Sequence, residues 1–521
     1  MFDRAYPKFI YYGLILSLWF AAVYRAAHDL WTASFLFAWT SFLALLFCIG
    51  RWRDKKPIRV PLGLTVLFYC LSLSLSLSHS YDLGTTSLEL AGWLFTFLNF
   101  YLFINVMQEP QDVPRFFAIA SLIVVPLAVI ALGQQITGAP LNYGLVEIPF
   151  LGSTFRYGHW EIYATLVNSV VMAGFMLCWL LFSWDQAVRQ RRYLVVFLAI
   201  VVTLVLARSW WALLASSLGF LLYYHRHLIG WQSRHKKMSV LGLTTIVVVL
   251  TFAFYVKTHH REASGGPIAS YNVSDRWIYW AAASRMWKQN PWTGVGLGGF
   301  ATAYPFFKTR PIENTRFAHS FFIQQMAETG FVGIAAFIFL IYQCLKLRLL
   351  KDPRTRRIQP LTVFDITLAI VLFYSLISIN MDFLLNKWTF FLILGAALLP
   401  SPLPTYQPRP LWLATGGICL VLASAFWLPW LPASQRYVSG LTYEEQGNEA
   451  KASESYQSAV ALDPLQADSY WRLARLFEKK FMKSRSPGDL EAARLYLRQA
   501  IQYKKDFRFL EEMRRLETLP S

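Results

Sequence analysis

The chain passes from a polar segment into an apolar one at the run His319-Ser320-Phe321-Phe322-Ile323-Gln324-Gln325-Met326-Ala327-Glu328-Thr329-Gly330-Phe331-Val332-Gly333. A long polar stretch, about Lys257 to Glu328, leads up to this change, and apolar spans dominate the rest of the sequence. His319 is therefore expected where an aqueous loop re-enters a membrane. An ionisable side chain at such a border is costly to keep, so His319 is a candidate functional residue. A histidine satisfied within its loop is the alternative, and Glu328 could cap or pair with it.

The composition indicates an all-α, polytopic membrane protein. Of 521 residues, 55% are hydrophobic and only 15% are charged. No small-residue cleavage site follows the first apolar run, Phe9 to Ala27, so we expect it to be a retained span. At roughly 20 apolar residues per helix, we count about thirteen spans. Their expected ranges are 9–27, 31–50, 60–79, 87–107, 115–134, 160–182, 193–207, 209–224, 238–256, 329–347, 363–380, 384–400 and 411–430.

The formal charge is +19, and the distribution of the basic residues predicts the orientation of these spans. In a soluble protein such a charge would suggest a nucleic-acid partner, but here basic residues concentrate in the short loops 51–56, 189–192, 226–237 and 346–357. A cytoplasmic N-terminus puts all four loops on the cytoplasmic side, as the positive-inside rule requires. We therefore expect no nucleic-acid partner. The expected outer segments are 80–86, 135–159, 207–208, the large loop 257–328 and the tail.

The sequence divides into four expected regions: N-terminal spans (1–149), a core with the outer loop (150–345), C-terminal spans (346–432) and a polar tail (433–521). In the tail, small and aromatic residues recur at a spacing typical of tetratricopeptide-like helix pairs. They are Gly440, Ala452, Tyr456, Ala459 and Pro464, then Tyr470, Leu473, Ala474, Phe477, Ala493, Leu497 and Ala500. A plain amphipathic helical tail is the alternative.

Two arginines on the outer side are candidate anion ligands. Arg208 divides an apolar stretch that is too short for two full spans. It could snorkel at a turn between short helices, or it could contact an anion in a cavity. Arg276 lies in an expected loop helix that runs through Lys288, where it could form an exposed ion pair with Asp275. An arginine fork is also a preferred partner of phosphate.

Other polar groups on the same side carry weaker signals. Arg156, His159 and Glu161 fall within six residues at the entrance of the sixth span, either lining the same cavity as substrate-binding groups or forming an interfacial cluster. The glycine-rich segment from Asn290 to Phe300 superficially suggests a phosphate cradle, but no strand precedes it and a tight turn is favoured. The five cysteines lack metal-ligand spacing, so we expect no disulfide, metal or cofactor.

Three ordered motifs resemble the O-antigen ligase and polysaccharide polymerase superfamily. The first is Leu206-Ala207-Arg208-Ser209-Trp210. The second runs from Ser274-Asp275-Arg276 to Trp280 and into Asn290-Pro291-Trp292-Thr293-Gly294-Val295-Gly296-Leu297-Gly298-Gly299-Phe300. The third is His319-Ser320, nine further residues, Gly330, two residues and Gly333. The resemblance covers about residues 150–345. Ala207 departs from the Ser or Thr that commonly precedes the first arginine in this family.

The resemblance implies a GT-C-like membrane bundle in a bacterial cytoplasmic membrane. The odd number of expected spans puts the C-terminal tail outside the cytoplasm. It implies metal-independent, inverting transfer of a glycan from an undecaprenyl-diphosphate carrier to a lipid or glycan acceptor. Arg208 and Arg276 would bind the diphosphate, and His319 would activate the acceptor hydroxyl. The tail is not part of this resemblance. Helical repeats of this kind usually bind partners, so we expect the tail to bind a protein partner or recruit an acceptor. A base must be neutral, so we expect activity to fall at acidic pH, and a profile flat down to about pH 5 would argue against this role.

Other functions remain open at this stage. The acceptor could be a protein, which would make the chain an O-oligosaccharyltransferase. A flippase for lipid-linked glycans is a further alternative, although the two halves show no repeat and the polar residues gather at one face. A sensor or scaffold would need far fewer spans.

Overall fold

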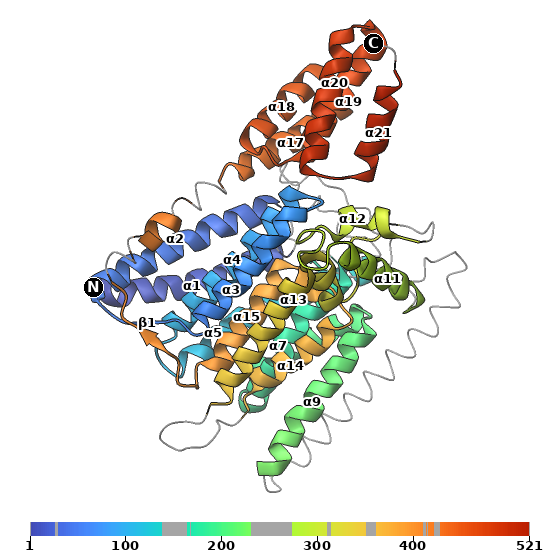
Figure 1. The fold of residues 1–521 in the computed structure, drawn as a ribbon. Helices are drawn as coiled ribbons and strands as arrows, with labels where there is room; N and C mark the ends of the chain where they lie inside the picture. The colour runs from blue at the N-terminus through green and yellow to red at the C-terminus, as the bar shows by residue number, and fades with distance from the viewer. Residues whose placement is uncertain are drawn as a thin grey trace.

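The computed structural model describes residues 2–24, 26, 30–137, 164–166, 168–230, 273–309, 314–350, 361–409, 413, 415–420, 422 and 428–519. Helices make up nearly all of the regular structure (Figure 1). In the first half these are α1 (Phe2–Val23), α2 (Leu30–Asp54), α3 (Gly63–Ser74), η2 (Leu75–His79), α4 (Leu83–Val106), α5 (Asp112–Ala120), η3 (Ser121–Ile123), α6 (Val124–Thr137), α7 (Ser169–Arg189), η5 (Arg191–Tyr193), α8 (Leu194–Leu206) and α9 (Trp210–Gly230).

The second half continues with α11 (Val273–Gln289), α12 (Phe300–Phe307), α13 (Phe321–Arg348), α14 (Val363–Ser375), η6 (Asn380–Asp382), α15 (Leu384–Leu398), α17 (Trp430–Glu445), α18 (Glu449–Leu462), α19 (Ala467–Ser484), α20 (Pro487–Tyr503) and α21 (Phe507–Glu517). Two short strands, β1 (Ile58–Arg59) and β2 (Thr405–Tyr406), pair antiparallel, with Ile58 opposite Tyr406.

The fold class expected from composition is confirmed. Within the described residues, six helical segments are long and apolar enough to cross a membrane. They are Tyr6–Val23, Thr32–Asp54, Leu83–Val106, Asp112–Thr137, Ser169–Arg189 and Phe321–Arg348. Shorter apolar helices lie at Gly63–His79, Val363–Ser375 and Leu384–Leu398. The expected spans 238–256 and 411–430 lie wholly or largely outside the described residues.

One expected span, 329–347, corresponds to the second part of α13, which follows a backbone break at Gly330. We did not predict the first part of α13, which begins eight residues before the expected start, at Phe321. The side chain of Ser320 accepts a hydrogen bond from Ile323 N–H and caps the helix. Polar residues such as Gln324, Gln325 and Glu328 are buried inside the protein in this first part, which is why hydropathy alone missed it.

α15 is the centre of the bundle and packs against α4, α7 and α14. Its residues from Leu385 to Leu398 are all buried. Trp388 is fully buried and meets Phe95 of α4 edge to face, with ring centroids 5.1 Å apart. Tight aromatic packing of this kind fixes the neighbouring helix ends to which the polar turns attach.

Two basic residues of the expected cytoplasmic loops, Arg189 and Arg348, lie at the end of this bundle opposite the candidate residues. At one end, Arg189 of α7 and Thr362 at the start of α14 line a common cavity, and Arg348 pairs with Asp365 at 2.8 Å. At the other end, Val170 near the start of α7 accepts a hydrogen bond from Tyr374 near the end of α14. The turn that carries Arg208 joins this second end, because the next residue, Ser209, shares a hydrogen bond with Tyr374.

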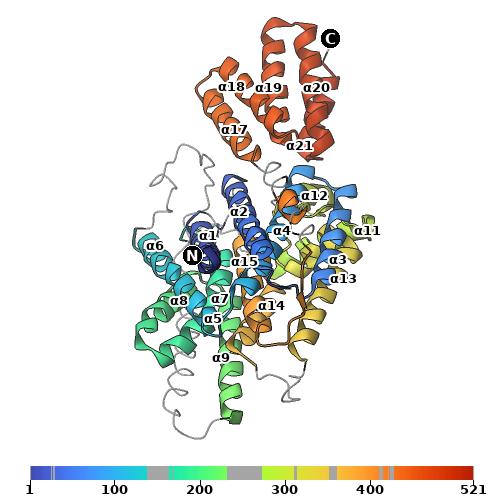
Figure 2. The same cartoon turned by 90° about the vertical axis from the view of Figure 1, so that its left-hand side faces the viewer.

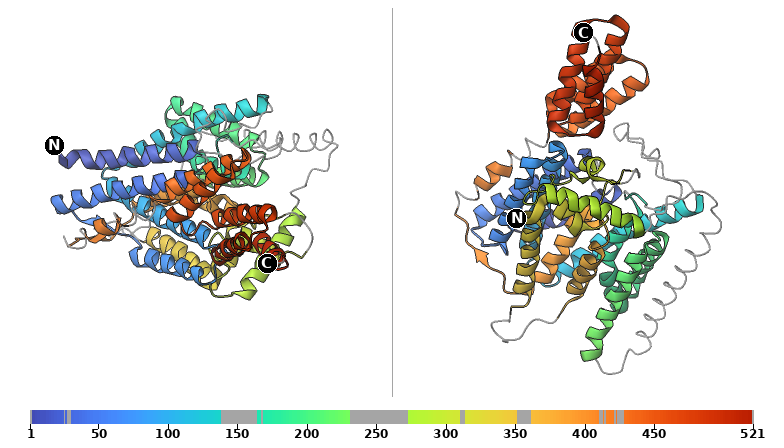
Figure 3. Two further views of the ribbon diagram at one scale, coloured as in Figure 1. Left: turned by 90° about the horizontal axis from the view of Figure 1, so that it is seen from above. Right: turned by 45° about the vertical axis from the view of Figure 1, so that its right-hand side comes forward.

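Helices α17 to α21 form a C-terminal unit, residues 430–519, that projects from one end of the bundle (Figures 2 and 3). α17 packs on α18 and α19 packs on α20, with Tyr456 and Leu497 in their cores. Gly440 of α17 lies against the ring of Tyr456, where a Cβ atom would come within 2.4 Å. These are helix pairs, and their assignment to the tetratricopeptide class stays a prediction.

Candidate functional site

The turn at Arg208 separates α8 from α9, as the sequence predicts. Arg208 is exposed and has a φ of 51°, a left-handed conformation that non-glycine residues rarely adopt. The next residue, Ser209, shares a hydrogen bond of 3.1 Å with the hydroxyl of Tyr374 on α14. This contact fixes the Arg208 turn to the end of α14.

Arg276 reaches the same end of α14 from the first turns of α11. Its Nη1 donates a 2.8 Å hydrogen bond to the carbonyl of Ile377, just beyond α14. Burial lowers the pKa of Arg276 from its usual value, and the nearby Tyr374 opposes this. The guanidinium remains a cation at neutral pH.

His319 lies beside Arg276. Its ring stacks on Tyr279 of α11, one helical turn from Arg276, with centroids 5.7 Å apart. Burial, followed by the positive charge of Arg276, lowers the pKa of His319 to about 4. The imidazole is thus neutral at physiological pH, the state that a general base requires. This lowered pKa places the expected acid loss of activity near pH 4, below the pH 5 that we set for an unperturbed imidazole.

The backbone around His319 is held in place from both sides. His319 itself has a φ of 55°. Ala318 N–H donates to the side chain of Gln324 at 3.0 Å, and the Ala318 carbonyl accepts from the indole of Trp280 at 2.9 Å. Phe321 N–H donates to Ser378 at 3.1 Å. A costly conformation persists only where its surroundings determine it, and such positions concentrate at functional sites.

A break in α13 joins the glycine-rich loop to the histidine segment. Gly330 has a φ of 64° and a ψ of −165°, which interrupts the helix. The loop docks into this break, since Val295 N–H donates to Ala327 and Phe331 N–H donates to Pro291. A Cβ atom on Gly330 would come within 2.3 Å of the Trp292 backbone. The two glycine motifs are therefore two halves of one structural joint.

The amide groups of the glycine-rich loop are already occupied. The carboxylate of Glu328 accepts hydrogen bonds from Gly298 N–H at 2.8 Å and Phe300 N–H at 3.3 Å. Gln324 donates to the same carboxylate at 3.1 Å. Glu328 thus binds the start of α12 where a phosphate would have to bind. The loop is a tight turn, as we favoured, and not a phosphate cradle.

The structure brings Arg208, Arg276 and His319 to one end of the bundle; we call these three residues the arginine–histidine site. Tyr374 links them, because it bonds Ser209 and lies close enough to Arg276 to act on its pKa. The expected ligands Arg156, His159 and Glu161 lie outside the described residues. Within the described residues, no group of three or more His, Cys, Asp or Glu side chains is placed to hold a metal ion.

Sequence reasoning missed two residues of this arrangement. Tyr374 lies inside an apolar span, so nothing in its local sequence marks it as a partner of the site. Glu328 was considered only as a partner of His319. Its spacing of four residues from Gln324, on one helix face, is the signal that could have revealed the pair.

The same segments are those that match a known family. Residues 193–338 match the family model for the O-antigen ligase. This core of the chain is therefore similar to the O-antigen ligase family. The match includes the Arg208 turn, α11, the glycine-rich loop and the break at Gly330. No curated protein matches the chain.

The matched core carries one departure from the sequence expected of that family, and the structure clarifies it. Ala207, where the family commonly has Ser or Thr, is buried next to the turn. The hydroxyl on the other side of Arg208, that of Ser209, is the one that anchors the turn to Tyr374. The turn is therefore held without a hydroxyl at residue 207.

Proposed function

We propose that this membrane enzyme of the O-antigen ligase type transfers a glycan from an undecaprenyl-diphosphate carrier to an acceptor hydroxyl. The observation that carries the proposal is the placement of a neutral imidazole, His319, beside a fixed cation, Arg276, with the Arg208 turn tied to the same helix end. Two guanidinium groups suit a diphosphate, and a neutral imidazole suits removal of a proton from a hydroxyl.

The proposed reaction is a single displacement. The acceptor oxygen attacks the anomeric carbon, and the bond from that carbon to the carrier diphosphate breaks. The bonding electron pair leaves with the diphosphate, whose growing negative charge is stabilised by Arg208 and Arg276. His319 takes the proton of the acceptor hydroxyl. Displacement from the side opposite the diphosphate would invert the anomeric centre.

The outer face of a cytoplasmic membrane is the proposed location of the site. The arginine–histidine site lies at the end of the bundle opposite Arg189 and Arg348. Because basic residues mark the cytoplasmic side, the site and the C-terminal unit would face away from the cytoplasm. A lipid carrier could then lie along the helices with its diphosphate at the surface.

A reconstitution experiment separates transfer from transport. The full chain in liposomes is given an undecaprenyl-diphosphate-linked glycan, together with membranes of the producing cells as a source of acceptor. We expect release of free undecaprenyl diphosphate together with a glycosylated acceptor. Movement of intact carrier lipid between leaflets without release would overturn the transferase and support a flippase. A glycosylated protein as the product would identify the protein-directed alternative.

A further inference from the structure

A second cavity, of about 590 Å³, lies between the bundle and the C-terminal unit. Its floor comes from α4, α13 and the start of α15, and one wall comes from α12. The opposite wall is built by residues of the C-terminal unit, including Lys504 and Phe507. We call it the roofed cavity. None of Arg208, Arg276 and His319 lines it, so it is distinct from the arginine–histidine site.

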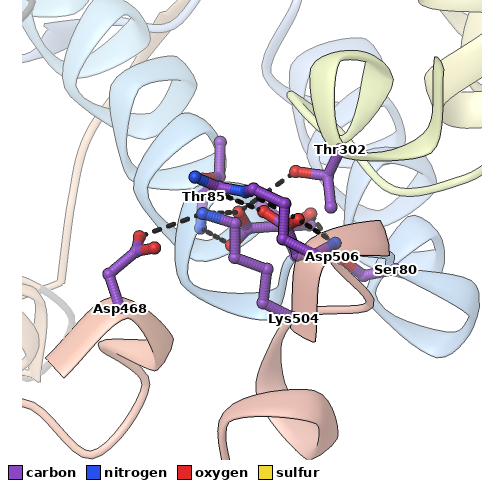
Figure 4. Close-up of polar contacts among 9 residues, drawn as sticks. Ser80, Thr85, Thr302, Asp468, Lys504 and Asp506 are labelled. Atoms are coloured by element: carbon purple, nitrogen blue, oxygen red, sulfur yellow. Dashed lines mark hydrogen bonds and ion pairs between the residues drawn. The ribbon is translucent and has the colours of Figure 1, made fainter. Parts of the chain in front are cut away.

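The C-terminal unit is fixed over this cavity by contacts with the outer end of α4. Lys504 pairs with Asp468 at 2.9 Å and Asp82 at 3.7 Å, and Thr302 of α12 donates to Asp82 at 3.4 Å (Figure 4). Lys505 N–H donates to the carbonyl of Tyr81 at 2.7 Å. The unit is thus a fixed wall of the cavity.

The charges that line the roofed cavity nearly balance. Five carboxyl groups and four cationic side chains contribute to it. Several are already paired, among them Lys387 with Glu89 at 3.0 Å and Arg508 with Asp506 at 2.6 Å. A diphosphate would meet no net positive field here, and a cation would meet no strong negative one. Paired charges and amides instead suit a neutral ligand that both donates and accepts hydrogen bonds.

Two buried polar atoms in the lining have no hydrogen-bond partner within the described part of the chain. Gln325 is 2% exposed and its Oε1 is unpaired, and Asp382 Oδ2 is unpaired as well. Such groups are costly to bury without a partner. Burial, and next the charge of Glu328, raise the pKa of Asp382 well above its usual value. Phe317 and Phe507 add aromatic surface.

Short segments connect the roofed cavity to the arginine–histidine site. Phe317 lines the cavity and His319 follows two residues later, a separation of at most ~7 Å along the backbone. Asp382 lines the cavity and Ile377, which binds Arg276, precedes it in the same turn. A ligand held in the cavity would therefore lie near the base, in a cavity that neither Arg208 nor Arg276 lines.

We infer that the roofed cavity binds the sugar residues of the acceptor, and that the C-terminal unit forms one wall of this acceptor site. The inference rests on the proposed function. Attack opposite the leaving diphosphate requires the acceptor to approach from the side away from Arg208 and Arg276. The roofed cavity, which neither arginine lines, provides a polar pocket of nearly balanced charge near His319 for it. Hydroxyl-rich sugars would satisfy the unpaired atoms of Gln325 and Asp382.

Blocking the cavity with a label on an introduced cysteine tests the inference. Ala301 of α12 lines the cavity, so Ala301→Cys places a thiol there without removing a polar contact. The variant is compared with itself before and after labelling by maleimides of increasing size, in membranes of the producing cells that hold native donor and acceptor. Ala450→Cys on the exposed surface of α18 is the matched control. Labelled wild-type protein controls for the native cysteines, of which Cys419 is exposed.

We expect the largest label on Ala301→Cys to lower transfer to the acceptor by about tenfold or more, the scale of a steric misfit in a binding pocket. Release of undecaprenyl diphosphate by transfer to water should persist. Complete labelling with unchanged transfer would overturn the inference, as would an equal loss of transfer and release. If unlabelled protein shows neither transfer nor release, the proposed function fails and not this inference alone.

Discussion

The guanidinium of Arg276 lies beside the imidazole of His319, and its charge adds to burial in lowering the pKa of that imidazole to about 4. The same guanidinium donates to the carbonyl of Ile377 at 2.8 Å, so its position is fixed by the backbone. One residue thus serves two proposed purposes. It offers a cation to the diphosphate and keeps its neighbour unprotonated.

The pH dependence of kcat/KM tests this pairing. A neutral His319 is required, so activity should be constant at neutral pH and fall as pH drops through about 4. In Arg276→Gln, loss of the positive charge should raise the pKa of His319, and the acid limb should move to higher pH. Lys288→Gln removes an exposed charge from the same helix and should keep the wild-type limb. Identical acid limbs in all three proteins would show that Arg276 does not act on His319.

Tyr374 is predicted to position the Arg208 turn. Tyr374→Phe removes the hydrogen bond to Ser209, which is worth about 1 kcal/mol. We expect KM for the lipid-linked donor to rise severalfold while the acid limb of the pH profile stays in place. Tyr342→Phe, on an exposed face of α13, should change neither quantity. An unchanged donor KM in Tyr374→Phe would mean that the turn is held without this contact.

The break in α13 should tolerate only glycine at residue 330. Gly330→Ala forces a left-handed alanine and drives its Cβ into the Trp292 backbone. Gly447→Ala in the C-terminal unit has a similar φ of 73° but meets no atom within 4 Å. The control should lose only about 1 kcal/mol of stability. Gly330→Ala should lose more, seen as a lower melting temperature and lower activity in detergent. Equal losses of stability in the two variants would show that the backbone around residue 330 can adjust to a Cβ atom at little cost.

Lys504 should hold the C-terminal unit on the bundle. Burial acts to lower its pKa, but the charges of Asp468 and Asp82 outweigh burial and raise it, so the pair is intact at neutral pH. Lys504→Met leaves two carboxylates without their cation, a cost of about 3 kcal/mol. We expect faster hydrogen exchange in residues 80–86 and 500–508. Lys479→Met, which removes an exposed partner of Glu449, should leave these segments unchanged. If hydrogen exchange in these segments is as slow in Lys504→Met as in the wild type, Lys504 does not hold the C-terminal unit on the bundle.

Sequence reasoning identified the features that depend on local pattern. Apolar runs predicted the helices, and the break at Ala207 and Arg208 falls where expected, because a charge in an apolar stretch marks a turn. The glycine-rich loop was expected as a tight turn, and three of its glycines have positive φ. Arg208, Arg276 and His319 were selected from their motifs, and the structure brings them to one end of the bundle.

The rest depends on contacts between distant segments, which no local pattern reports. Tyr374 joins the site through a residue 165 positions away, and Lys504 meets a helix start more than four hundred residues earlier. The first part of α13, before the break at Gly330, was missed because its polar residues are buried by protein and not by lipid. The pKa of His319 likewise follows from burial, which sequence alone does not give.

A single-turnover transfer assay on His319→Ala tests the central claim most directly. The control is His79→Ala, since His79 lies at the same end of the bundle, where its Nδ1 is 3.0 Å from Thr293 Oγ1 in the glycine-rich loop. Loss of a general base should slow transfer by about 10²–10⁴-fold in His319→Ala, with donor binding retained and the His79 variant near wild type. Wild-type transfer rates in His319→Ala would contradict the account.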